Sequence, residues 1–291
     1  MLKLNKFDKF LWKHQRVLLT TAWIVAILPL LIMNVIDFDM VLPYLAIIVL
    51  EFLVFVIAIL EIIVSSKIRT FAKVHNYQLN MQAFIEGTKL LIEATNPKNK
   101  TQLAVNSYNL ITTYFTMGDY DRAENEINLF LQHFGDNKDV SLKIKIYAKM
   151  AQIALIKGNY EIYNEYIRRI HTLLESVRGL KMVINMLNYD YMNLMLWVDA
   201  FTCGENINEA GYEAKVFEVL NTSQFTGKPR KKEIMPIEYI SAYYKLFLFF
   251  KNKKNTEKAT FYANLLMTFG NAQLVAYREA KEYLENENRS N

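Results

Sequence analysis

Two segments of the sequence share one pattern around a glycine: LITTYFTMGDYDRAENEI at residues 110–127 and MAQIALIKGNYEIYNEYI at residues 150–167. Apolar residues recur every three to four positions on both sides of the turn G-x-Y, which is the spacing of two amphipathic helices joined by a short turn. Glycine permits this turn because it has no Cβ atom. A weaker third copy, LFLFFKNKKNTEKATFYA at residues 246–263, lacks the glycine. The pattern predicts a series of helical hairpins.

This pattern resembles the tetratricopeptide repeat, whose antiparallel helix pairs stack into a solenoid. The first copy carries the positions that characterise the family: Leu110, Tyr114, Gly118, Tyr120 and Ala123. The tyrosine after the turn packs between the two helices, and the small alanine allows the helices to approach each other. The resemblance covers residues 104–134 and 144–174, and more weakly 237–270. It implies a degenerate tetratricopeptide-like α-solenoid over residues 67–291.

The sequence also departs from the family pattern. The distance from Gly118 to Gly158 is 40 residues, whereas the family repeat has about 34. Tyr163 occupies the position of the small residue in the second copy. Elsewhere the same helical periodicity continues, and only 9 glycines and 5 prolines occur, which disfavours a β fold. We therefore expect an all-α domain, with a buried central helix at 181–202 and a capping helix at about 272–286.

Before this domain, two stretches of apolar residues predict a transmembrane hairpin at residues 17–66. The first span covers residues 17–36, and the second covers residues 44–64. Twenty helical residues extend about 30 Å, which matches the hydrocarbon thickness of a bilayer. Residues 37–43 form a short acidic loop between the spans, and residues 1–16 form a basic N-terminus.

Basic residues flank the hairpin on one side only. Five precede the first span and three follow the second: Lys3, Lys6, Lys9, Lys13 and Arg16, then Lys67, Arg69 and Lys73. The loop between the spans carries Asp37 and Asp39 but no cation. The positive-inside rule therefore predicts that both termini are cytoplasmic. The chain is rich in Lys, Asn and Ile, a composition typical of proteins from AT-rich bacterial genomes. We therefore expect the membrane to be a bacterial plasma membrane.

Glu51 lies near the middle of the second predicted span, where a carboxylate is costly. One interpretation makes it a proton or cation site, or the partner of a basic residue in another membrane protein. The other keeps it protonated and hydrogen-bonded within the hairpin. Pro29 in the first span supports the second interpretation, because it leaves the carbonyl of Val25 without its helical donor.

The sequence contains neither a glycine-rich phosphate loop nor a G-x-S-x-G elbow. The four histidines are His14, His75, His133 and His171, and they show no metal-ligand spacing. Cys203, the only cysteine, has no motif around it. We therefore expect no enzymatic activity, no cofactor and no metal. The net charge of +5 is modest and indicates no nucleic-acid partner.

In tetratricopeptide repeats the first helix of each pair lines a concave groove that holds an extended peptide or a partner helix. The resemblance implies such a groove here, lined by Tyr108, Asn109, Thr112, Phe115, Lys145, Lys149 and Gln152. Asn109, Lys145 and Lys149 partly match the family's clamp for a peptide carboxylate. A solvated row of lysines is the alternative interpretation.

Two loops are basic. One contains Lys228, Arg230, Lys231 and Lys232, and the other contains Lys251, Lys253 and Lys254. Near an anionic leaflet each cation contributes about 1 kcal/mol to docking, but solubility explains the loops equally well.

These features together favour a membrane-anchored scaffold or adaptor that binds a protein or peptide at the cytoplasmic face of the membrane. The alternative is an accessory or immunity subunit of a membrane transporter or pore system. Such a subunit would act through the hairpin and Glu51.

Overall fold

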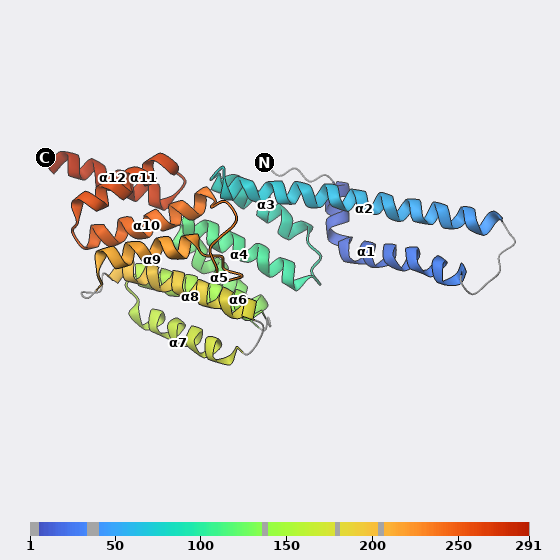
Figure 1. Cartoon of the computed structure of the whole chain (residues 1–291), viewed down its shortest axis with the longest axis horizontal. Helices are drawn as coiled ribbons and strands as arrows, with labels where there is room; N and C mark the ends of the chain where they lie inside the picture. Colours follow the sequence, from blue (N-terminus) through green and yellow to red (C-terminus); the bar gives the residue numbers. More distant parts are fainter. Residues whose placement is uncertain (1–5, 34–40, 136–138, 178–180, 203–206, 291) are drawn as a thin grey trace.

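The computed structural model describes residues 6–33, 41–135, 139–177, 181–202 and 207–290. Within these ranges the chain forms twelve α-helices, and its one isolated β-bridge joins Thr222 to Pro229. The predicted all-α class is confirmed. Two long helices, α1 (Lys6–Met33) and α2 (Val41–Asn76), form an antiparallel hairpin that projects from a body of shorter helices (Figure 1).

The body consists of antiparallel helix pairs in chain order. Its described helices are α3 (Met81–Ala94), α4 (Lys100–Thr116), α5 (Tyr120–Phe134), α6 (Val140–Ile156), α7 (Tyr160–Ser176), α8 (Lys181–Thr202), α9 (Glu209–Asn221), α10 (Pro236–Asn252), α11 (Thr256–Phe269) and α12 (Val275–Ser290). The pairs α4–α5, α6–α7 and α10–α11 coincide with the three copies predicted from the sequence. The predicted central helix at 181–202 is α8, which buries Leu187, Leu194 and Trp197.

One turn geometry joins all three pairs. Gly118 and Gly158 have φ angles of 74° and 71°, and Lys254 occupies the same place in the third pair with φ 58°. The following residue caps the second helix through its side chain in every case: Asp119, Asn159 and Asn255. The missing glycine therefore does not change the third turn. Its left-handed conformation costs about 1–2 kcal/mol for a residue with a Cβ atom.

A related turn joins α2 to α3 and was not predicted. Leu79 has a φ angle of 54°, and the side chain of Asn80 caps α3 by accepting from the backbone N–H of Ala83 at 3.1 Å. The C-terminal part of α2 thus forms the first helix of an additional pair. Phe71 of α2 stacks on Phe84 of α3 with ring centroids 4.9 Å apart.

The predicted spans at 17–36 and 44–64 fall within α1 and α2, except for residues 34–36. Residues 34–36 lie outside the described residues, as do Lys3, Asp37, Asp39 and Cys203. Among the residues that the structure describes, no helix combines the length and the apolar character needed to cross a membrane. α2 continues without a break through the predicted domain boundary at residues 66 and 67. Near this boundary Lys67 forms an ion pair with Asp8 of α1 at 2.8 Å.

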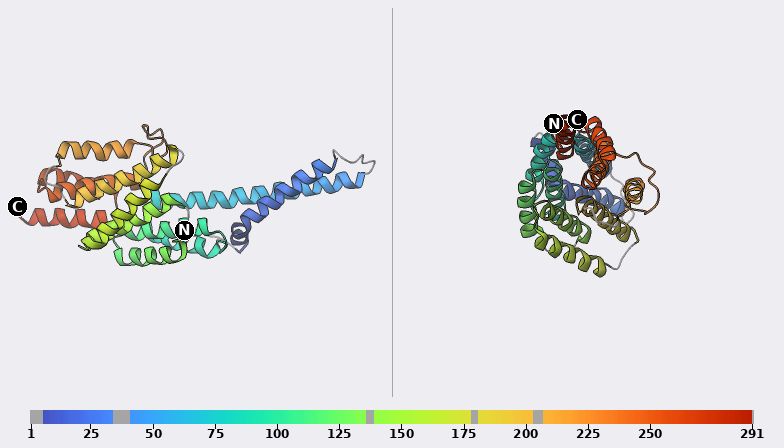
Figure 2. Two further views of the ribbon diagram at one scale, coloured as in Figure 1. Left: turned by 90° about the horizontal axis from the view of Figure 1, so that it is seen from below. Right: turned by 90° about the vertical axis from the view of Figure 1, so that its left-hand side faces the viewer.

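The two ends of the helical body meet. The side chain of Asn271 donates to the carbonyl of Leu79 at 3.0 Å, and the backbone N–H of Gln82 donates to the side chain of Gln273 at 3.0 Å. Arg278 of α12 donates to the carbonyl of Met117, in the turn between α4 and α5, at 2.5 Å. α12 packs on α11 (Figure 2), and the contacts of Asn271, Gln273 and Arg278 join this end of the body to the first pairs.

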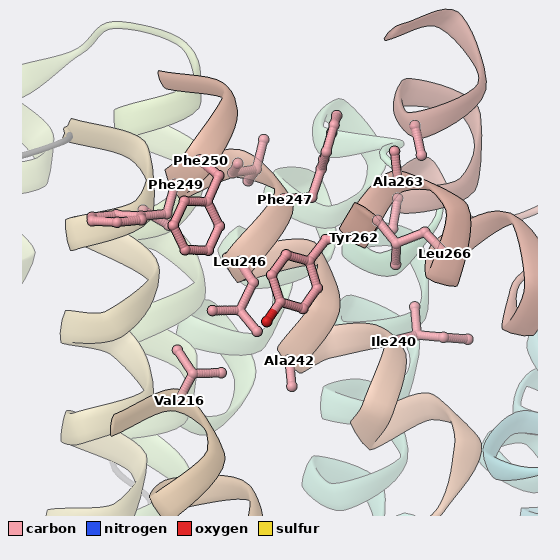
Figure 3. Close-up of a cluster of buried hydrophobic side chains, with 14 of the residues drawn as sticks. Val216, Ile240, Ala242, Leu246, Phe247, Phe249, Phe250, Tyr262, Ala263 and Leu266 are labelled. Atoms are coloured by element: carbon pink, nitrogen blue, oxygen red, sulfur yellow. The ribbon is translucent and has the colours of Figure 1, made fainter. Parts of the chain in front are cut away.

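The core is densest around α10. Leu246, Phe247, Phe249 and Phe250 are all fully buried, so this helix has no solvated face over that turn. They meet Tyr262, Ala263 and Leu266 of α11, and Val216 approaches from α9 (Figure 3). Such all-round burial explains why the third copy keeps its position in the stack without the turn glycine.

Candidate functional site: a cavity with two buried lysines

The curved body forms a partly open cavity of about 370 Å³, a volume within the range of ligand pockets. Its walls come from α4, α6, α8 and α10, with contributions from α2, α9 and α12. The first helices of the three predicted pairs all line it. Apolar side chains, among them Trp197, Leu196 and Ile240, form much of the wall.

Six of the seven predicted groove residues line this cavity: Tyr108, Thr112, Phe115, Lys145, Lys149 and Gln152. Asn109 does not. It lines a smaller neighbouring cavity of about 190 Å³ with His75 and Phe84. The predicted set of Asn109, Lys145 and Lys149 is therefore not assembled in one cavity. Tyr108 and Thr112 line both cavities, whereas Asn109 lines only the smaller one.

Lys149 of α6 is held between aromatic and polar neighbours. Its ammonium nitrogen lies 4.0 Å from the centroid of the Phe115 ring and donates to the side-chain oxygen of Gln152 at 3.0 Å. Burial, together with the positive charge of Lys245, lowers the pKa of Lys149 to about 7, and the charge of Asp190 opposes this fall. The two ammonium groups are therefore close enough to repel each other.

Lys245 of α10 is buried, with 7% of its surface exposed, whereas Lys149 is half-buried. Its ammonium nitrogen donates only within its own helix, to the carbonyl oxygen of Ser241 at 3.3 Å and to the Ser241 hydroxyl at 3.2 Å. Burial lowers the pKa of Lys245 to about 8. Among the described residues, neither Lys149 nor Lys245 forms an ion pair with a carboxylate.

Lys245 was not predicted, although the sequence carries a signal for it. When residues 246–263 are aligned with 150–167, Lys245 and Lys149 each stand one position before the first residue of the copy. The two lysines therefore occupy equivalent positions on the first helices of two pairs. Because those helices line the same cavity, the repeat itself brings both ammonium groups into it.

The third lysine of the cavity is neutralised. Lys145 of α6 lies 3.7 Å from the carboxylate of Asp190 on α8. Burial raises the pKa of Asp190 to about 6, while the charge of Lys145 opposes this rise. The carboxylate oxygen Oδ2 of Asp190 is buried and has no hydrogen-bond partner. A row of solvated lysines is thus not what the structure contains, since Lys145, Lys149 and Lys245 all lie in the cavity wall.

The remaining acidic group of the cavity, Glu238 at the start of α10, is also neutralised. Arg230 donates to both of its oxygens, at 2.8 and 2.6 Å, and the backbone N–H of Met235 donates at 2.8 Å. Arg230 is therefore engaged in a bidentate ion pair, whereas Lys228, Lys231 and Lys232 of the same predicted basic loop are exposed. In the other basic loop, Lys251 lies over the Phe247 ring, with 5.6 Å between its ammonium nitrogen and the ring centroid.

Glu51 lies far along the sequence from this cavity, on the exposed surface of α2. Nothing is described of the side chains of Val25 and Pro29. Within the described residues no group of three or more His, Cys, Asp or Glu side chains is placed to hold a metal ion.

Comparison with protein-family models, with curated proteins and with solved structures finds no match to this chain.

Proposed function

We propose that this protein is a membrane-anchored helical-repeat adaptor, without enzymatic activity, that binds a segment of a protein partner in the cavity. The observation that carries the proposal is the convergence of Lys149 and Lys245 on one cavity, where neither forms an ion pair with a carboxylate of the described residues. Burying a charge without an ion-pair partner destabilises a protein. Groups held in such an unfavourable state concentrate at functional sites, where a ligand completes their interactions.

The closed shape of the body limits the kind of protein segment that can bind. In an open solenoid an extended peptide can run along the whole concave face. Here Asn271 donates to Leu79 in the turn before α3, and Arg278 donates to Met117, so the ends of the curve are joined. The cavity of about 370 Å³ therefore suits a short segment, such as a chain end or a single loop, better than a long peptide.

Exposed apolar side chains on α2 support the proposed anchor. Ile48, Phe52, Phe55 and Ile62 each expose more than 60% of their surface, on the part of the hairpin that projects from the body. Exposed apolar surface of this kind marks a membrane or protein contact. We propose insertion in a bacterial plasma membrane with both termini cytoplasmic, so alkaline extraction should leave the protein in the membrane pellet. Its release into the supernatant would contradict the anchor.

The continuity of α2 gives the anchor a further role. A helix of 36 residues is about 54 Å long and runs from the projecting end of the hairpin to His75, which lines the cavity. No flexible linker separates the two. On this proposal the cavity is presented at a fixed distance and orientation relative to the bilayer.

The test compares cavity-filling variants with an outer-surface control. Ala148→Trp and Thr116→Trp place an indole in the cavity from α6 and α4, whereas Asn128→Trp places one on the exposed face of α5. Full-length proteins in mild detergent are used to capture partners, which are identified by mass spectrometry. We expect one partner to be captured by wild type and by Asn128→Trp, and to be lost with both cavity variants. A partner that all variants retain would place the binding surface outside the cavity.

The second candidate function is that of an accessory or immunity subunit of a membrane transporter or pore system. Its supporting observation is that Glu51 is exposed on α2 among the exposed apolar residues. If the carboxylate contacts a channel or transporter, Glu51→Gln should abolish the effect on that system without lowering the amount of protein in the membrane. Unchanged activity of Glu51→Gln would exclude this role.

A further inference from the structure

Hydrogen-bonding atoms without a partner gather on the wall of the cavity. Among the described residues, five buried side-chain nitrogen or oxygen atoms have no hydrogen-bond partner. Three of them, His75 Nε2, Thr112 Oγ1 and Asp190 Oδ2, belong to residues that line the cavity. The other two, Thr88 Oγ1 and Asn106 Nδ2, belong to residues outside its described wall. Because a buried polar atom without a partner is costly, this gathering indicates a site that a ligand completes.

Two of these residues stand where two cavities adjoin. His75 of α2 and Thr112 of α4 line both the cavity of about 370 Å³ and the neighbouring cavity of about 190 Å³. They therefore mark the junction of the two cavities. The smaller cavity has about half the volume of the larger one, so it suits a single side-chain group rather than a length of chain.

Each of the three atoms can accept a hydrogen bond. The Nδ1 atom of His75 lies 2.8 Å from the Oδ1 atom of Asn76, which can only accept, so Nδ1 carries the proton and Nε2 is an acceptor. Burial lowers the pKa of His75, which keeps the ring neutral at pH 7. The Thr112 oxygen can accept whichever way its proton points. Asp190 Oδ2 lies 3.7 Å from the ammonium nitrogen of Lys145, which is too long for a hydrogen bond.

The charge of the cavity decides which donor group fits there. Lys145 already neutralises Asp190, and Lys149 and Lys245 line the same cavity without an ion pair to the described carboxylates. A ligand cation would be repelled by these ammonium groups, so a neutral donor is favoured. A hydroxyl group is neutral but brings only one donor. A primary carboxamide is neutral and brings two N–H donors on one nitrogen.

We propose that the junction of the two cavities binds a primary carboxamide group, which donates one N–H to His75 Nε2 and the other to Thr112 Oγ1. Asp190 Oδ2 is then left to accept from a backbone N–H of the bound segment in the larger cavity. The inference rests on the proposed function and names the side chain by which the partner segment is recognised, that of Asn or Gln. A free small amide carries the same group.

The first measurement compares three probes of nearly equal shape by ligand-observed NMR, with the full chain in mild detergent. Butanamide carries the carboxamide, 2-pentanone has a methyl group in place of its nitrogen, and butanoate has an oxygen there. We expect butanamide to bind at least fivefold more tightly than either of the other two probes. Equal binding of the three probes, or no binding of butanamide, would overturn the inference.

Two variants assign the effect to the junction, and a third is their matched control. Thr112→Val and His75→Phe each remove one acceptor with little change in shape, and each should weaken butanamide binding at least fivefold. Thr88→Val removes a buried hydroxyl that also lacks a partner but lies outside the described walls of both cavities. It should leave the affinity unchanged. Unchanged affinity in both junction variants would contradict the proposed site.

Stability separates a binding role of Thr112 from a structural one. Replacing a buried polar atom that has no partner with an apolar group of the same shape is neutral or stabilising. Thr112→Val should therefore keep or raise the urea midpoint of the full chain while it weakens butanamide binding. A lower urea midpoint with unchanged butanamide binding would make the hydroxyl structural and refute its role as an acceptor for the ligand.

Capped tetrapeptides decide the source of the carboxamide. Their sequence is Leu-Leu-X-Leu, where X is Gln, Glu or Met, and their acetyl and N-methylamide ends bring no primary carboxamide. Tighter binding of the Gln peptide assigns the site to a protein side chain. Binding of butanamide alone supports the inference and counts against a protein partner. If Ala148→Trp abolishes partner capture but butanamide does not bind, the proposed function stands and the carboxamide inference fails.

Discussion

Replacing Gly118 with alanine tests whether the helical body is closed by α12. Gly118 and Gly158 form a matched pair, because they occupy the same turn position with φ angles of 74° and 71°. Alanine at either position adopts a left-handed conformation, which costs about 1–2 kcal/mol. The reduced entropy of the unfolded chain returns about 0.4–1 kcal/mol. From backbone conformation alone, the two variants should lose the same stability.

The surroundings of the two glycines differ. A Cβ atom at Gly118 would lie 2.8 Å from the Cγ2 atom and 2.9 Å from the Cβ atom of Val275, at the start of α12. A Cβ atom at Gly158 would meet nothing within 4 Å. Overpacking of this kind costs about 1–3 kcal/mol. Gly118→Ala should therefore lose about 2–4 kcal/mol and Gly158→Ala about 1 kcal/mol.

The assay is urea unfolding of the full chain in one detergent, followed by far-ultraviolet circular dichroism. Val275→Gly removes both the Cγ2 and the Cβ atom that a methyl group at position 118 would meet. Relative to its effect on the wild type, it should therefore recover at least 1 kcal/mol in the Gly118→Ala background and none in the Gly158→Ala background. Equal losses for the two glycine variants, or no coupling between positions 118 and 275, would refute the closure of the body by α12.

Three further predictions follow from the turn, the cavity and the loop before α10. Lys254→Gly should stabilise the protein by about 0.5 kcal/mol. Glycine removes the conformational cost of a left-handed residue with a Cβ atom, and this gain exceeds the larger backbone entropy that glycine loses on folding. A lower urea midpoint would contradict this. Lys245→Met should raise the free energy of unfolding by about 1–3 kcal/mol at pH 7. Because the pKa of Lys245 is lowered to about 8 by burial, this gain should be full below pH 8 and vanish by about pH 10.5, and a gain that does not depend on pH would refute it. Glu238→Gln should cost about 1–3 kcal/mol, because it removes the negative charge and one of the two oxygens that accept from Arg230. An unchanged free energy of unfolding in urea would contradict this.

Local sequence was sufficient to predict the helix pairs. The three copies at 104–134, 144–174 and 237–270 correspond to α4–α5, α6–α7 and α10–α11. Helical periodicity and turn chemistry act over a few residues, so each copy specifies its own hairpin. The capping residue Asn255 was a usable signal for the third turn, because it matches Asp119 and Asn159 even though the glycine is absent.

The closure of the body could not be predicted in the same way. It depends on contacts such as those between Asn271 and Leu79 and between Arg278 and Met117, which join residues more than 160 positions apart. No short pattern encodes such contacts. Their position depends on small rotations that accumulate from one helix pair to the next.

The site was predicted in part for the same reason. Helix periodicity decides which side of α4 and α6 faces inward, and six of the predicted groove residues line the cavity. Lys145 pairs with Asp190 of α8, and Asn109 lines the smaller neighbouring cavity, so the binding role of these residues stays a prediction. Lys145 is neutralised by a residue of α8, and the repeat pattern does not predict where α8 lies.

The most direct test of the account is site-specific photo-crosslinking of the full-length protein in native membranes. A benzophenone amino acid replaces Ser241, which lines the cavity beside Lys245, or Asn128 on the exposed face of α5 as the control. The account predicts that irradiation joins a single protein partner to position 241 and not to position 128. The cross-link should disappear when Lys149 and Lys245 are both replaced with methionine. A partner joined only at position 128, or a cross-link at position 241 that persists without both lysines, would contradict recognition in the cavity.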